Sequence, residues 1–170
     1  MTTTPLDGAG PRLALEALAG TYADAGYGSL VLCAPSTTTG RCTGVLAAFA
    51  AVDAAQPSAP NAPHTSDTLY AAWPRVWASH VRLVRANDAP NTFVLVPTSL
   101  FPQGYGRDGT PFETPEDPGA PAPPRVEFVV TTNGQVQGFG VFGLVGEVTE
   151  RERLGITVKE RAEVWYERVV

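Results

Sequence analysis

Short apolar runs recur along this chain, and Gly, Pro or polar residues separate them. The clearest runs are 27–33 (YGSLVLC), 91–96 (NTFVLV) and 125–131 (RVEFVVT). Alternation of apolar and polar positions over four to eight residues is typical of a half-buried β-strand. The pattern therefore predicts a β-rich protein built from many short strands.

The run 76–85 (VWASHVRLVR) alternates over its whole length, and we predict that it is a strand. Successive side chains of a strand point to opposite faces of the sheet. One face would carry Trp77, Ser79, Val81 and Leu83, and the other His80, Arg82 and Val84.

Turn chemistry gives the strongest local signal at Asn133-Gly134, between runs 125–131 and 135–141. Asn-Gly between two β-patterned runs is typical of a two-residue hairpin turn. We predict a β-hairpin there.

Several segments are less decided. The Ala-rich run 43–53 follows a polar turn, which favours a strand, but its composition leaves a helix open. Residues 13–18 can form one helical turn. The closing segment favours a long strand over 156–169, and a short helix over 147–154 is possible.

The irregular connection from Pro97 to Pro124 is the longest in the sequence. Such a loop in a compact domain is usually functional, so we expect a lid. Residues 1–13 are rich in Thr, Gly and Pro and predict a disordered lead-in. The domain then spans residues 14–170.

Together these signals predict an all-β fold of about eight to ten antiparallel strands. We expect this sheet to close into a barrel, because closure hides its edge strands. An eight-stranded barrel has room for packed side chains or one small ligand. We therefore expect a lipocalin-like barrel, and a β-sandwich is the alternative.

Composition agrees with this fold and limits the partners. The 170 residues include 17 Gly and 16 Pro, which suits short strands joined by irregular loops. The net charge of −5 opposes binding to nucleic acid and to an anionic membrane. The chain starts without a signal peptide, so we expect a cytoplasmic protein, or a secreted one if it is excised from a larger precursor.

Cys33 and Cys42 are nine positions apart and flank a polar turn. They suit a disulfide, and two free buried thiols are the alternative. There is no CxxC motif, and His64 and His80 are distant in sequence, so we predict no metal site.

The sequence contains no hydrolase elbow, no Ser-x-x-Lys, no His-Glu-x-x-His and no nucleotide-binding loop. We predict no cofactor. An active site without a motif would draw on weak candidates with acid, base or anion-binding groups. These catalytic candidates are His80, Arg82, Tyr105 and Glu127.

Aromatic residues are spread over segments that would be neighbours in a barrel. They can line a ligand site, although barrels also need such bulk as simple core filling. The predicted ligand-binding residues are Trp73, Arg75, Trp77, Phe101, Phe128 and Phe139.

Six segments carry a resemblance to a known family: LAGTYADAGYGSLVLCAPS, WPRVWASHVRL, LFPQGYGRDGTPFET, VEFVV, GQVQGFGVFG and ERAEVWYERV. Over residues 15–170 the chain resembles the C-terminal domain of fungal β-lactamase-like serine hydrolases, which are related to penicillin-binding proteins. The resemblance implies a lipocalin-like barrel that starts at Gly20-Thr21-Tyr22. It also implies a late arginine, Arg161 or Arg168, across Tyr22, and both cysteines in one hairpin.

The catalytic domain of that family, with its Ser-x-x-Lys motif, has no counterpart here, so no hydrolase residue carries over. Three functions stay open. The first is a barrel that binds a small apolar molecule. The second is a cofactor-free isomerase or cyclase of a fungal natural product, which uses the barrel as a container. The third is an accessory domain that packs on a serine-hydrolase partner.

Overall fold

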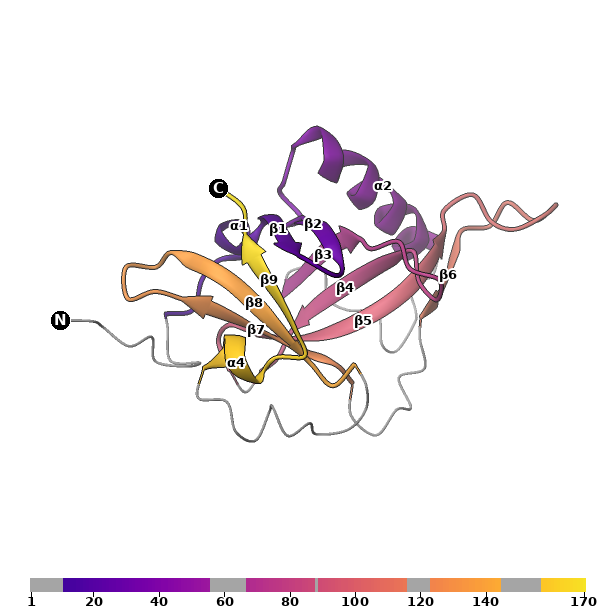
Figure 1. Ribbon diagram of the computed structural model, residues 1–170. Helices are drawn as coiled ribbons and strands as arrows, with labels where there is room; N and C mark the ends of the chain where they lie inside the picture. The colour runs from indigo at the N-terminus through magenta and orange to yellow at the C-terminus, as the bar shows by residue number, and fades with distance from the viewer. Residues whose placement is uncertain (1–10, 56–66, 88, 116–122, 145–156) are drawn as a thin grey trace.

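The computed structural model describes residues 11–55, 67–87, 89–115, 123–144 and 157–170 (Figure 1). Within them lie nine strands and three helices. The strands are β1 (Gly20–Asp24), β2 (Gly28–Leu32), β3 (Thr68–Ala72), β4 (His80–Arg85), β5 (Thr92–Phe101), β6 (Phe112–Pro115), β7 (Arg125–Val130), β8 (Val136–Phe142) and β9 (Val164–Arg168). The helices are α1 (Leu15–Leu18), α2 (Gly40–Ala55) and α4 (Val158–Arg161).

Eight strands form a nearly closed antiparallel barrel in the order β2-β1-β9-β8-β7-β5-β4-β3. The last gap, between β2 and β3, is bridged at Cys33 and Tyr70. Each of these residues donates its backbone N–H to the other's carbonyl, at 2.7 and 2.9 Å. The predicted lipocalin-like all-β barrel is confirmed, and so is the hairpin at Asn133-Gly134, which joins β7 to β8.

The barrel interior is packed with apolar side chains from every strand of the ring. The strand predicted over 76–85 is formed only over His80–Arg85, and residues 76–79 precede it. Within β4 the predicted alternation holds, because Val81 and Leu83 belong to this core while Arg82 contacts groups outside the ring. Tyr22 is fully buried and meets the rings of Phe128 and Phe139 edge-on, with centroids 6.1 and 5.0 Å away.

One end of the barrel is closed by α1 and Arg168. Tyr22 donates its hydroxyl to the Leu18 carbonyl at 2.6 Å. The Arg168 guanidinium lies 5.7 Å from the centre of the Tyr22 ring and donates to the carbonyls of Ala17 and Ala19. The expected late arginine across Tyr22 is therefore Arg168.

Segment 40–55 is the helix α2, so the strand favoured for 43–53 is wrong. Its buried residues Cys42, Phe49 and Val52 recur at helical spacing and pack beside Tyr70, outside the ring of strands (Figure 1). Ala has the highest helix propensity of all residues, and its abundance in this segment favours the helix over a strand.

The two cysteines form a disulfide, with their Cα atoms 5.6 Å apart. It joins the residue after β2 to the first turn of α2. The resemblance implies that both cysteines lie in one hairpin. This is wrong, because Cys42 belongs to helix α2. The disulfide therefore fastens α2 to the barrel wall.

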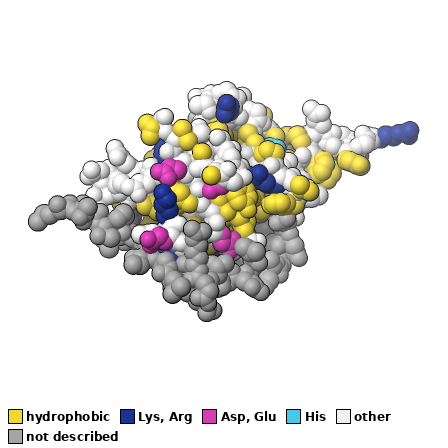
Figure 2. Space-filling model, in the orientation of Figure 1, with side chains coloured by type: hydrophobic (Ala, Val, Ile, Leu, Met, Phe, Trp, Pro, Cys, Tyr) yellow, Lys and Arg dark blue, Asp and Glu magenta, His cyan; other side chains and the backbone are white. Residues whose placement is uncertain are grey.

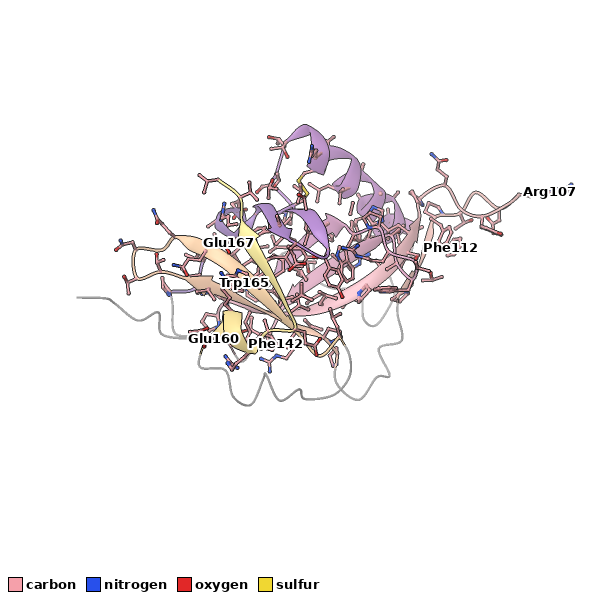
Figure 3. The ribbon with its side chains drawn as sticks, in the orientation of Figure 1. Arg107, Phe112, Phe142, Glu160, Trp165 and Glu167 are labelled. Atoms are coloured by element: carbon pink, nitrogen blue, oxygen red, sulfur yellow. A yellow bond between two sulfur atoms is a disulfide. The ribbon has the colours of Figure 1, made fainter. Side chains whose placement is uncertain are left out.

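The connection expected over 97–124 is largely structured. β5 continues to Phe101 and pairs with β6, so that Phe101 lies opposite Phe112. The resulting hairpin projects away from the barrel, with Arg107 at its tip (Figure 3). Its described part is not a lid. Residues 116–122 lie outside the described ranges.

The C-terminal segment also differs from the predicted single strand over 156–169. Helix α4 interrupts it, and Thr157 and Glu160 form a capping box at its start. The helix expected over 147–154 and the lead-in over 1–10 lie outside the described residues. Residues 11–13 are held in place, because Pro11 and Leu13 hydrogen-bond to Asn91.

Candidate functional site

An apolar cavity lies inside the barrel, toward the end where β1 turns into β2. The space open to the centres of water-sized molecules is only about 10 Å³. That is room for about one water, whereas pockets for drug-sized ligands measure roughly 300–1,000 Å³. The barrel interior is therefore filled by its own side chains. The cavity is lined by Tyr27, Leu30, Trp73, Val81, Leu83, Leu95, Phe139, Val141, Leu144, Val164 and Tyr166.

Three aromatic rings are in contact at this end of the barrel, which we call the mouth: Tyr27, Trp73 and Trp77. Tyr27 and Trp73 are stacked, with centroids 6.3 Å apart, and Trp77 meets Trp73 edge-on at the same distance. Trp73 is buried, but half of Trp77 is exposed. Figure 2 shows hydrophobic side chains gathered on the face between the β1–β2 hairpin and the projecting β5–β6 hairpin.

A guanidinium group lies among these rings. The Cζ atom of Arg75 is 4.8 Å from the centre of the Tyr27 ring and 5.1 Å from that of Trp73. One terminal nitrogen donates to the Tyr27 carbonyl at 2.6 Å. Its Nε is buried and has no hydrogen-bond partner within the described part of the chain.

Tyr166 adds a hydroxyl to the mouth. Its oxygen accepts a hydrogen bond from Trp73 Nε1 at 3.2 Å. Burial raises the pKa of Tyr166, and the nearby Trp73 and Arg75 only partly oppose that effect. The hydroxyl therefore keeps its proton at neutral pH and can donate it.

The structure brings three of the six predicted ligand-binding residues together at the mouth, namely Trp73, Arg75 and Trp77. Phe139 lines the cavity below them. Phe128 packs deeper, against Tyr22, Phe93 and Phe139. Phe101 lies on the projecting hairpin, stacked on Phe112 with centroids 4.5 Å apart, and it takes no part in the mouth.

Sequence reasoning missed two residues of this site, Tyr27 and Tyr166. The Gly26-Tyr27-Gly28 turn was the available signal for the first, because a turn at a strand end places its side chain at a barrel rim. Asp24 Oδ1 accepts the backbone N–H groups of Gly26 and Tyr27 and fixes that turn. For Tyr166 the signal was its alternation with Val164 on the closing strand.

The four catalytic candidates do not meet. His80 and Arg82 share the outer face of β4, beside α2. Tyr105 is 76% exposed on the projecting hairpin. Glu127 lies on β7, where its carboxylate is 3.7 Å from Arg161.

Arg82 belongs to a buried ionic cluster that joins three elements. It pairs with Asp53 of α2 at 2.8 Å and with Glu113 of β6 at 2.9 Å, and its side chain is only 2% exposed. Thr98 donates its hydroxyl to the same Glu113 carboxylate. Phe49 covers the guanidinium at 4.6 Å. Two carboxylates therefore neutralise the charge of Arg82.

His80 also packs against α2. Its ring meets Phe49 edge-on at 5.5 Å, and its Nδ1 shares a hydrogen bond of 2.8 Å with the Ser79 hydroxyl. Burial lowers the pKa of His80.

Across the described ranges, no three His, Cys, Asp or Glu side chains come close enough to hold a metal ion. No helix among these residues has the length and apolar character to cross a membrane. No protein-family model, curated protein or solved structure matches this chain. The resemblance to the C-terminal domain of fungal β-lactamase-like hydrolases stays a prediction.

Proposed function

We propose that this protein is a binding module that recognises a small, flat, mainly apolar molecule at the mouth of its barrel. The observation that carries this proposal is the pair of rings, Tyr27 and Trp73, that hold Arg75 at the end of an apolar cavity, with the half-exposed Trp77 against Trp73. Aromatic side chains offer large apolar area and favour stacking with other rings.

The ligand stacks on the mouth and does not fill the barrel, because the interior has space for about one water molecule. Trp77 is half exposed and Val76 fully exposed, so the loop between β3 and β4 presents apolar surface to a ligand. A ring that covers Trp77 removes this surface from water, which is favourable in proportion to the area buried.

A neutral aromatic probe tests the proposal. We expect 2-naphthamide to bind in isothermal titration calorimetry, and Trp77→Ala to weaken binding about tenfold through the loss of stacking area. Trp165→Ala is the matched control, because that ring lies on the outer wall of β9 beside Glu167 (Figure 3). Equal affinities for the two variants would contradict a site at the mouth.

The filled interior and the exposed Val76 and Trp77 favour a second function, an accessory domain that packs on a β-lactamase-like serine hydrolase. Exposed apolar surface of this kind marks protein interaction sites. The test is co-elution in size-exclusion chromatography with a hydrolase catalytic domain of the penicillin-binding type. Trp77→Asp should abolish the complex, and Trp165→Asp should leave it intact.

The isomerase or cyclase alternative has the least support from the geometry. Its candidate acid and base groups lie on the outer wall, on the projecting hairpin and on β7. None of them is among the residues that line the cavity.

A further inference from the structure

Arg82 and Arg85 are buried, Arg75 is partly buried, and the three differ in what neutralises them. Arg82 has two carboxylates. Arg85 donates to two carbonyls, and its Nε, which lacks a hydrogen bond, lies 3.4 Å from the Asp67 carboxylate. Arg75 has the Tyr27 carbonyl and the neighbouring Tyr166 side chain as partners, no carboxylate within 4.0 Å among the described residues, and a buried Nε without an acceptor there.

Such an arrangement is costly for a folded protein. A guanidinium carries five N–H donors, and a buried donor left unpaired loses its bonds to water without replacement. The rings of Tyr27 and Trp73 hold the group by cation–π contacts, which attract the charge but supply no acceptor oxygen. The two rings therefore hold Arg75 in position while its Nε–H donor stays without an acceptor among the described residues.

Tyr166 supplies a second donor next to it. Its oxygen already accepts from Trp73, and the described residues provide no acceptor for its proton. The Asp24 carboxylate, whose charge acts on Tyr166, takes part in the turn, where its Oδ1 accepts two backbone N–H groups. The mouth thus offers donors to an oxygen that the described residues do not provide.

We infer that the ligand of the mouth is an aromatic carboxylate, whose oxygens pair with Arg75 and Tyr166 while its flat body stacks on the surrounding rings. This inference rests on the proposed function. A planar guanidinium matches the two oxygens of a carboxylate, and hydrogen bonds between charged groups are stronger than neutral ones. Because Nε is covered, binding requires a shift of the loop that carries the exposed Val76 and Trp77.

Two probes of nearly the same shape test the charge. We expect 2-naphthoate to bind at least tenfold more tightly than neutral 2-naphthamide in calorimetry at pH 7 and low salt. Arg75→Gln should remove this preference and leave the affinity for the amide within about threefold. Arg107→Gln, at the tip of the projecting hairpin, is the control and should keep the full preference.

The outcomes distinguish a failure of the carboxylate inference from a failure of the proposed binding function. If both probes bind the wild-type protein equally and Trp77→Ala weakens both, the mouth binds apolar molecules and the carboxylate inference is wrong. If Trp77→Ala changes the affinity for neither probe, the proposed site itself is wrong. Arg75→Lys covers the case in which the glutamine variant does not fold. It keeps the charge but lacks the planar fork, so an undiminished preference in that variant would reject pairing through the guanidinium.

Discussion

Arg82 and Arg75 show how much of a charged residue's role depends on groups distant in sequence. Periodicity placed Arg82 on the face of its strand opposite Val81 and Leu83, which is correct. Its partners Asp53 and Glu113, however, are 29 and 31 residues away and come from a helix and from a strand that the sequence did not predict. A structural role for Arg82 therefore could not be told from a catalytic one by pattern alone.

We predict that Arg82→Met destabilises the protein by about 3 kcal/mol, because it leaves two carboxylates in a partly buried site without their cation. Asp53 and Glu113 are only 28% and 18% exposed. Urea unfolding followed by circular dichroism measures the change.

The control for this prediction neutralises the whole cluster. In Arg82→Met/Asp53→Asn/Glu113→Gln, no buried charge remains unpaired, so at least half of the lost stability should return. A single variant within about 0.5 kcal/mol of wild type would show that the cluster is unimportant for stability.

His80 gives a prediction about pH. Burial lowers its pKa, so the folded state binds the proton more weakly than the unfolded chain does. The stability that neutral His80 contributes is complete above the unfolded pKa of about 6.5 and is lost as the pH falls below it. We expect the free energy of unfolding to fall less between pH 7.5 and pH 5 in His80→Gln than in wild type. An identical fall in both proteins would mean that His80 titrates alike in the two states.

Among the elements, those with local turn or cap signals were the predictable ones. Asn133-Gly134 specified the β7–β8 hairpin, since an Asn-Gly turn needs no distant partner. The Thr157–Glu160 capping box was also visible in the sequence and was overlooked. Helix α2 was only the alternative to the favoured strand over 43–53, because a short Ala-rich run is compatible with both a buried strand and a helix. The β5–β6 hairpin was hidden by Pro97, because proline within a run argues against a strand.

The disulfide is an element-scale device, because it holds the start of α2 while the Arg82–Asp53 pair holds its end. We predict that Cys33→Ser/Cys42→Ser lowers stability by about 2–3 kcal/mol, the chain-entropy value for so short a loop. Helix content should persist, since Phe49 and Asp53 still dock. Far-ultraviolet circular dichroism with urea titration checks both points. Loss of the α2 signal would show that the disulfide alone keeps the helix in place.

For the molecule as a whole, barrel closure decides which residues meet. Trp73 and Tyr166 are 93 positions apart and are joined by a hydrogen bond at the mouth. Strand alternation assigns each residue a face, but only the register and order of the closed sheet determine which strand ends come together. The sequence therefore predicted the class of fold and half of the candidate ligand site, and it could not separate Phe101 from Trp73.

The closing seam between β2 and β3 is the weakest joint of the barrel, and hydrogen exchange can show this. Among the described residues it is spanned by the Cys33–Tyr70 bridge alone, whereas β7 and β8 pair along most of their length. Local openings break the smallest set of contacts first, so the amides of Cys33 and Tyr70 should exchange faster than those of Val126 and Phe139. Because the disulfide holds α2 to the seam at Cys33, its removal should speed exchange at Tyr70 more than in β7–β8. If all four amides instead exchange at one common rate, the barrel opens as a unit and the seam is no weaker than its other joints.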